Sequence, residues 1–273
     1  MTTAVAPQPT RVAYGDDPNQ FADLWLPNDA AAGDAPRSVV VLIHGGFWRA
    51  QYGLDLMDPL AADLVGQGFA VWNIEYRRVG QDGGGWPGTL EDVAAAIDQL
   101  VALDEQDGPD VTVDLDDVIV VGHSAGGHLA LWAAGRDQLG DGQPGADPVV
   151  MPRLAIGQGP VGNLVEAAEL GAGNGAVVDF LGGTPAEYPE RYRSADPHIG
   201  ADVAVVVVRG TDDTIVLADY TVPDVAGVVT VVDIEGEDHF DLIDPASRSW
   251  AAVVAAIDGR DNDAPDPATT FTG

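Results

Sequence analysis

The sequence of 273 residues contains no cysteine. Disulfide bonds, thiolate catalysis and metal sites built on cysteine are therefore excluded. No apolar run approaches the roughly 18 residues that a membrane-spanning helix needs. The first ten residues have no basic stretch and no apolar core of signal-peptide length. We therefore expect a soluble, cytoplasmic protein with no membrane partner.

Lysine is absent as well, so all 12 basic residues are arginines, and 44 acidic residues bring the formal net charge to −32. Such a surface repels nucleic acid and anionic membranes, because binding to either depends on Lys and Arg that neutralise phosphates. Two interpretations of the acidic excess stay open on composition alone: adaptation to high salt, and the codon usage of a GC-rich genome. We expect a small-molecule partner and no nucleic acid.

Two short motifs carry most of the chemical information. Residues 122–126 read Gly-His-Ser-Ala-Gly, the G-x-S-x-G spacing of a nucleophile elbow, and residues 44–48 read His-Gly-Gly-Phe-Trp. Each directly follows an apolar run, 117–121 and 38–43 respectively. A strand that breaks into a glycine-flanked serine holds one hydroxyl at the top of a sheet, and a glycine loop offers backbone N–H groups to an oxyanion. Together the motifs indicate a serine hydrolase.

Apolar runs alternate with helical patterns along the whole chain. Strands separated by helices require right-handed crossovers, so we predict a mostly parallel α/β sheet with helices on both faces. Reactive groups in such a sheet collect at the carboxyl ends of the strands. The predicted strands are 21–26 (antiparallel), 38–43, 69–75, 118–121, 154–156, 203–208 and 228–234, and the predicted helices are 59–66, 87–103, 126–134 and 248–257.

A single α/β domain over residues 1–258 accounts for the length of the chain. The stretch from 160 to about 200 leaves room for a small cap, too short for a large lipase lid, which favours short and soluble substrates. Residues 104–117 are predicted to form a solvated loop. Residues 259–273, rich in Asp, Pro and Thr, are predicted to form a flexible acidic tail.

The hydroxyl of Ser124 needs a base, and the base needs a group that orients it. His239 follows the last predicted strand, where a long loop can return an imidazole over the sheet, and it is the best base by elimination and position. The other four histidines lie inside the two motifs, one helical turn beyond the serine, or in a loop: His44, His123, His128 and His198.

The strand predicted at 203–208 is followed by Asp212 and Asp213, and either carboxylate could face the imidazole from there. A carboxylate at this point would fix the tautomer of His239 and stabilise its protonated form. The resulting order along the chain, Ser, Asp, His, is the order found in α/β-hydrolases.

These residues resemble those of the α/β-hydrolase superfamily, close to the small esterases of the hormone-sensitive-lipase type and to kynurenine formamidases, which carry H-G-G-x-W. The resemblance covers residues 12–257 and implies an α/β-hydrolase fold that works without metal or cofactor. In that superfamily the acid lies in a G-x-x-D step, which here ends at Asp213. The oxyanion donors of the family correspond to the N–H groups of Gly46, Phe47 and Ala125.

An aromatic side chain beside the glycine loop can line an acyl or aryl pocket, so we predict that Phe47 and Trp48 contact the substrate. Arg77 and Arg78 could bind an acidic substrate, but structural ion pairs with nearby carboxylates are favoured. The expected activity is hydrolysis of short-chain or aryl carboxylic esters by a monomer or homodimer. The alternatives are an arylformamidase acting on N-formylkynurenine, favoured by residues 44–48, and a non-catalytic ligand-binding member of the fold.

Overall fold

The computed structural model describes residues 8–27, 37–105, 113–200, 202–223 and 228–259. In these residues eight strands form one sheet: β1 (Thr10–Ala13), β2 (Phe21–Trp25), β3 (Arg37–Ile43), β4 (Ala70–Ile74), β5 (Val113–His123), β6 (Leu154–Gln158), β7 (Ala204–Gly210) and β8 (Val229–Ile234). Their order across the sheet is β1-β2-β4-β3-β5-β6-β7-β8. The pairs β1·β2 and β2·β4 are antiparallel, and every pair from β4 to β8 is parallel. The predicted mostly parallel sheet is confirmed.

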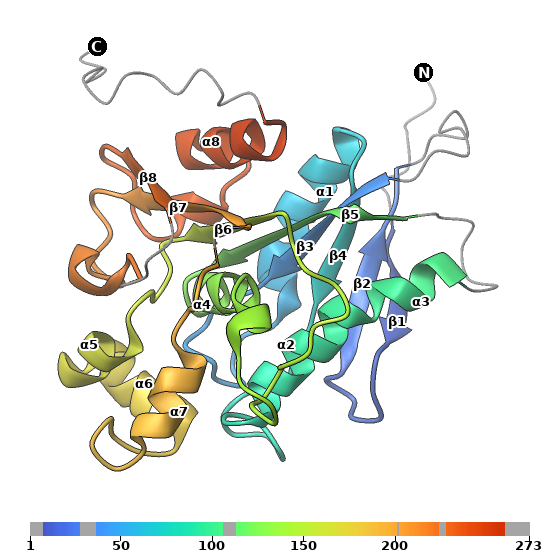
Figure 1. Cartoon of the computed structure of the whole chain (residues 1–273). Helices are drawn as coiled ribbons and strands as arrows, with labels where there is room; N and C mark the ends of the chain where they lie inside the picture. Colours follow the sequence, from blue (N-terminus) through green and yellow to red (C-terminus); the bar gives the residue numbers. More distant parts are fainter. Residues whose placement is uncertain (1–7, 28–36, 106–112, 201, 224–227, 260–273) are drawn as a thin grey trace.

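Helices cover both faces of this sheet (Figure 1). One face carries α1 (Asp58–Gly66) and α8 (Arg248–Ile257), and the other carries α2 (Gly88–Asp98), α3 (Leu100–Glu105) and α4 (Ala125–Ala133). Successive side chains of a strand point to opposite faces. Along β3, accordingly, Val39, Val41 and Ile43 pack into the core under α2 and α4, while Val40 and Leu42 pack against α1 and α8.

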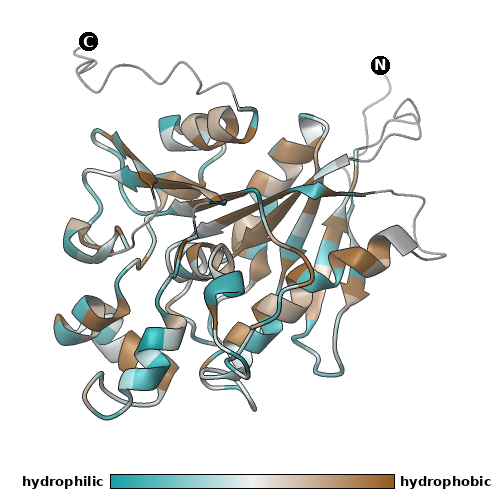
Figure 2. Ribbon diagram, in the orientation of Figure 1, coloured by the Kyte–Doolittle hydropathy of each residue, from teal (hydrophilic) through white to brown (hydrophobic). Residues whose placement is uncertain are grey.

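The apolar residues are concentrated in the central strands and in the helix surfaces that face them (Figure 2). A strand buried on both faces is apolar at nearly every position, which explains the uninterrupted run Val-Val-Val-Leu-Ile that ends β3. This core holds the carboxyl ends of β3, β5, β6 and β7 side by side. The segments that follow these four strands therefore lie close together in space.

Between β6 and β7 the chain forms a helical insert of three helices: α5 (Leu164–Glu169), α6 (Ala172–Leu181) and α7 (Pro189–Ala195). The three helices lie together at one corner of the molecule, away from α8 (Figure 1). The start of α6 is interrupted by three left-handed residues, Gly173, Asn174 and Gly175, with φ values of 58°, 55° and 79°. This left-handed turn lies against the ring of Phe47.

The predicted elements match the structure in type, and the helix at 248–257 matches in its bounds. Two expectations are wrong. The helix predicted at 87–103 divides at Gln99 into α2 and α3, and the loop predicted at 104–117 is strand from Val113 onwards. The four aspartates between 110 and 117 suggested a solvated loop, but Val113 is buried and pairs with Arg37. The predicted tail lies outside the described residues apart from Gly259.

Candidate active site

Ser124 lies in a sharp turn between β5 and α4. Its φ and ψ of 56° and −120° are values that side-chain-bearing residues rarely adopt, so the turn is strained. Glycines on both sides make the turn possible, because a Cβ on Gly122 or on Gly126 would collide with neighbouring backbone. The N–H of Ser124 donates to the carbonyl of Gln158 at 2.8 Å, which ties the turn to the end of β6. Ser124 therefore has a fixed position at the carboxyl edge of the sheet.

Residues 44–48, which we call the oxyanion loop, pass directly beside this turn. Three of them have positive φ: 112° at Gly46, 56° at Phe47 and 55° at Trp48. The approach depends on Gly45, because a Cβ there would lie 2.9 Å from the Cβ of Ser124. Within the described residues, no hydrogen-bond acceptor is recorded for the N–H groups of residues 46, 47 and 125. These are the three oxyanion donors that the resemblance to α/β-hydrolases implies.

His239 lies between β8 and the short 3₁₀ helix at Asp241–Ile243, and only 4% of its surface is exposed. Its Nδ1 lies 2.7 Å from Oδ2 of Asp213. The N–H groups of Ile215 and Val216 donate to the other oxygen of this carboxylate, at 2.8 and 2.9 Å. Since a carboxylate accepts, Nδ1 carries the hydrogen, and Nε2 of His239 is left with a lone pair that can take up a proton.

Asp213 is ionised in this setting. Burial raises its pKa, but the hydrogen bond from His239, the charge of that imidazole and the two backbone N–H groups outweigh burial, so the pKa lies below the usual value. Asp212 is exposed and makes no contact with the imidazole; its backbone N–H donates to the carbonyl of Glu237. Of the two candidates left open by position along the chain, Asp213 makes the hydrogen bond.

Gly159 joins the two halves of the site. It follows Gln158, the residue that anchors Ser124, and a Cβ on it would lie 3.2 Å from Oδ2 of Asp213 and 3.3 Å from Nδ1 of His239. The end of β6 therefore supports the serine on one side and the His–Asp pair on the other. The structure brings His239 and Asp213 into contact, and Ser124 follows directly on His123, whose ring lies against that of His239.

His44, the first residue of the oxyanion loop, is fully buried and has a hydrogen-bond partner at each ring nitrogen. Nδ1 lies 2.7 Å from the carbonyl oxygen of Gly45, and Nε2 lies 2.9 Å from Oε1 of Glu75. Both partners are oxygen acceptors, one on the main chain and one on a carboxylate. The ring of Tyr76 stacks on His44 with centroids 4.5 Å apart, and its hydroxyl donates to the His44 carbonyl.

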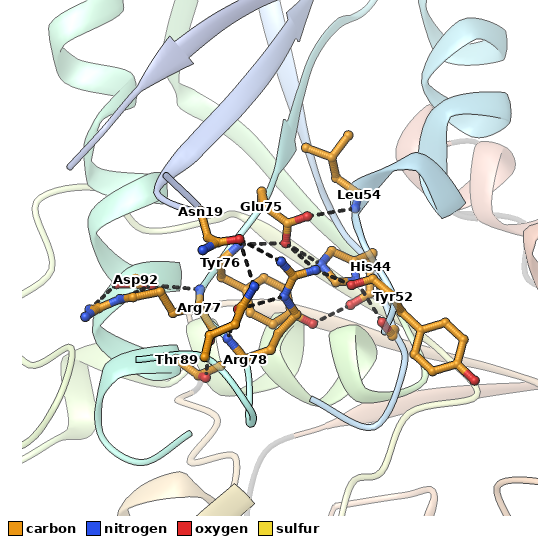
Figure 3. Close-up of polar contacts among 12 residues, drawn as sticks. Asn19, His44, Tyr52, Leu54, Glu75, Tyr76, Arg77, Arg78, Thr89 and Asp92 are labelled. Atoms are coloured by element: carbon orange, nitrogen blue, oxygen red, sulfur yellow. Dashed lines mark hydrogen bonds and ion pairs between the residues drawn. The ribbon is translucent and has the colours of Figure 1, made fainter. Parts of the chain in front are cut away.

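Glu75 stands at the centre of this buried network (Figure 3). It forms an ion pair of 3.0 Å with Arg78 and accepts hydrogen bonds from the N–H groups of Leu54 and Tyr76. Burial raises the pKa of Glu75, but the hydrogen bond and electrostatic interaction with His44, the charge of Arg78 and the Tyr76 N–H outweigh burial, so the pKa lies below its ordinary value. Glu75 is therefore an anion placed between two buried basic side chains.

The network acts on one peptide unit of the oxyanion loop. The carbonyl of Gly45 and the N–H of Gly46 belong to the same planar group and point in opposite directions. The hydrogen bond from His44 to this carbonyl fixes the plane, and it strengthens the N–H on the other side as a donor because linked hydrogen bonds polarise one another. The position of one predicted oxyanion donor thus depends on Glu75.

Replacing Glu75 by Gln tests this dependence. The substitution keeps the shape and leaves two buried basic groups without an anion, so we expect unfolding free energy to fall by about 3 kcal/mol and kcat by about tenfold. The folded-state pKa of Glu75 is lowered, so its contribution is present above the ordinary value of 4.5 and is lost as pH falls through the folded-state value. Urea unfolding at pH 7 and at acid pH measures this: the curves of wild type and variant should converge in acid. The control is Glu169→Gln, which makes the same change on an exposed side chain. Equal free energies of unfolding for wild type and Glu75→Gln at pH 7 would contradict the role of Glu75.

Phe47 and Trp48, both predicted to contact substrate, have different surroundings. Trp48 is 1% exposed and stacks on Phe180 at 4.7 Å, so it belongs to the core and the prediction for it is wrong. Phe47 borders a hollow of about 630 Å³ and lies against the left-handed turn of the insert, where a Cβ on Gly173 would collide with its ring. This hollow is bounded by Phe47, Arg49, Tyr52, Gly173, Asn174 and Ile215.

Ion pairs decide between the two roles considered for Arg77 and Arg78. Arg77 pairs with Asp92 at 2.7 Å and Arg78 pairs with Glu75, so both have the structural role that was favoured. Sequence reasoning did not identify Glu75 or the contacts of His123. Among the described residues, no group of His, Asp and Glu has the arrangement of a metal site, and no helix combines the length and apolarity needed to cross a bilayer.

The fold and the arrangement of this site are those of an α/β-hydrolase. More specifically, the chain belongs to the BD-FAE family, whose model matches residues 22–222.

Individual relatives are consistent with this assignment. Esterase LipC of Mycobacterium tuberculosis is 36% identical over 127 residues, which are 45% of this chain but only 28% of LipC, so the match spans under a third of that relative. A carbohydrate esterase from gut microbiota has the same fold, with a TM-score of 0.74 at 17% identity, covering 95% of this chain and 99% of its own. A thermophilic esterase of Thermogutta terrifontis has a TM-score of 0.68 at 19% identity, covering 98% and 96%.

Proposed function

We propose that the protein hydrolyses short-chain or aryl carboxylic esters through an acyl-enzyme formed on Ser124. The observation that carries the proposal is the 2.7 Å contact between His239 and ionised Asp213, next to a strained serine turn and three backbone N–H groups without a recorded acceptor. The similarity to proteins named esterases supports the same reaction class.

In the first half of the reaction, Nε2 of His239 takes the proton of the Ser124 hydroxyl as its oxygen attacks the ester carbonyl. The carbonyl oxygen becomes negative and is held by the N–H groups of Gly46, Phe47 and Ala125. Asp213 stabilises the protonated imidazole without taking its proton. The imidazolium then gives the proton to the departing alcohol, whose bond to the carbonyl carbon breaks.

The second half repeats these steps with water in place of the serine. His239 takes a proton from the water, the water oxygen attacks the acyl carbon, and the same three N–H groups hold the oxyanion. The bond to Ser124 then breaks and the serine oxygen regains a proton from His239. The products are the free acid and the resting protein, and each oxyanion donor contributes roughly two to three orders of magnitude to turnover.

We propose that the substrate extends from Ser124 into the hollow beside Phe47, because the N–H of Phe47 is one of the predicted oxyanion donors and its ring borders the hollow. Its volume of about 630 Å³ is within the range of small-molecule sites. Phe47, Tyr52 and Ile215 offer apolar surface to an acyl chain or an aromatic ring, while Arg49 and Asn174 offer polar groups. The left-handed turn of the insert limits the length of chain that fits. We propose the insert as a small cap over a short-substrate pocket.

A substrate panel tests the proposal. Purified protein is assayed with p-nitrophenyl esters of increasing chain length and with N-formylkynurenine. We expect the highest kcat/KM on the shortest chains, with a decline as the acyl chain exceeds the hollow. A far higher kcat/KM on the formamide would make the arylformamidase alternative correct, and no turnover of any compound together with no labelling by a fluorophosphonate would favour a ligand-binding role.

The same proposal extends to the organisation of the protein. We propose a single α/β-hydrolase domain up to residue 258 that acts as a monomer or homodimer in the cytoplasm, with no metal or cofactor. Activity that survives exhaustive chelation and dialysis would support the absence of a metal. Light scattering of the purified chain measures the oligomeric state directly.

A further inference from the structure

His123 is the last residue of β5 and immediately precedes Ser124. It is 3% exposed, and its ring lies against that of His239 with centroids 4.4 Å apart. Its Nε2 lies 2.9 Å from the backbone carbonyl oxygen of His239. A carbonyl only accepts, so Nε2 carries the hydrogen and donates it. His123 thus makes a hydrogen bond to the main chain of the very residue proposed as base.

The ring of His123 is neutral. Burial, and next the proximity of His239, lower its pKa to about 3, and the carbonyl of His239 and the carboxylate of Asp213 oppose this only in part. His239 and Asp213 are the titratable groups that face it. A neutral ring does not repel the imidazolium that forms on His239 during acyl transfer, whereas a cation at this place would.

The opposite edge of the ring faces the oxyanion loop. Nδ1 of His123 is buried and makes no hydrogen bond within the described residues, and a Cβ on Gly45 would lie 3.1 Å from it. The ring therefore occupies the space between Gly45 and His239. Both the distance and the orientation of the base relative to the oxyanion donors depend on what fills this space.

We propose that His123 is a positioning residue for His239. It holds the main chain of the base through the Nε2–H bond, while Asp213 holds the side chain through Nδ1, so two bonds from two different strand ends orient one imidazole. This inference rests on the proposed acyl transfer. A displacement of the base by about 1 Å is enough to cost on the order of a hundredfold in rate.

Three variants test the inference. His123→Phe keeps the ring volume and removes the donor, His123→Gln places an amide N–H near the former Nε2, and His123→Asn carries the same amide but is one methylene too short. Active sites are counted with a fluorophosphonate, and kcat and KM are measured per active site on a short p-nitrophenyl ester. We expect kcat to fall about 10- to 100-fold in His123→Phe and His123→Asn, with KM within about threefold of wild type. In His123→Gln we expect kcat to be at least tenfold higher than in His123→Asn.

A purely structural role would lower the melting temperature and the number of active sites while leaving kcat per site unchanged, and that result would overturn the inference. It would also be overturned if kcat per active site in His123→Gln were no higher than in His123→Asn. If His123→Phe does not fold, the comparison of His123→Gln with His123→Asn decides. Failure of the proposed function itself gives a different result: wild type would neither hydrolyse the esters nor react with the fluorophosphonate, and the role of His123 would fall with it.

Discussion

Replacing Ser124 by Ala should lower kcat on a short p-nitrophenyl ester by about four to six orders of magnitude. The variant keeps His239, Asp213 and all three backbone N–H donors, but it has no oxygen that can form the acyl-enzyme. The side-chain change removes one buried hydroxyl and leaves the Cβ in place, so the fold should be intact. Turnover per milligram and the melting temperature, measured on the same preparation, check both parts of this expectation.

Two controls separate loss of chemistry from loss of structure. The variant should no longer react with a fluorophosphonate, while wild type should be labelled once per chain. Ser124→Gly should be equally inactive yet unfold at a higher temperature, because φ and ψ of 56° and −120° suit glycine and the release of strain of about 1–3 kcal/mol exceeds the added chain entropy. Activity that persists in Ser124→Ala would show that Ser124 is not the nucleophile.

The parts of the fold that the sequence predicts best are local. The run ending in Ile43 and the run ending in Val121 are apolar on both faces, and each is followed by a glycine-rich turn, so strand, turn and function are visible within a dozen residues. The helix 248–257 has a serine N-cap at Ser247, and its side chain accepts from the Trp250 N–H as capping requires. Local signals of this kind do not depend on partners far along the chain.

Two contacts that the sequence does not predict join distant segments. Glu75 meets His44 across 31 positions and His123 meets the carbonyl of His239 across 116, so no spacing rule connects them. Glu75 ends the apolar strand predicted at 69–75, and this is the signal that could have identified it, because a carboxylate buried beside such a strand needs a partner.

For Trp48 the error is different: the motif predicted a substrate contact for a residue that lies in the core. Its place beside the glycine loop favoured a substrate contact, but the positive φ at Gly46, Phe47 and Trp48 turns the chain so that Phe47 borders the hollow while Trp48 enters the core. Alternate positions of a loop can face opposite directions, and only the backbone angles decide which side chain is outside.

Asp213→Asn should lower kcat by about four orders of magnitude while the site remains assembled. The carboxylate now accepts the Nδ1 hydrogen of His239 at 2.7 Å and so leaves the Nε2 lone pair free. An asparagine can turn its NH₂ group towards Nδ1, and the hydrogen of the neutral ring then moves to Nε2, where it blocks proton uptake from Ser124. The negative charge that stabilises the imidazolium is lost as well.

The adjacent residue supplies the matched control. Asp212→Asn makes the same chemical change one position away, on an exposed side chain without contact to His239, and should keep kcat within about twofold of wild type. The backbone N–H groups of Ile215 and Val216 still have an oxygen to bond to in Asp213→Asn, so its loss of activity should come with little loss of melting temperature. The reverse pattern, with Asp212→Asn inactive and Asp213→Asn active, would reassign the acid, because only the carboxylate that fixes the tautomer of His239 controls the rate.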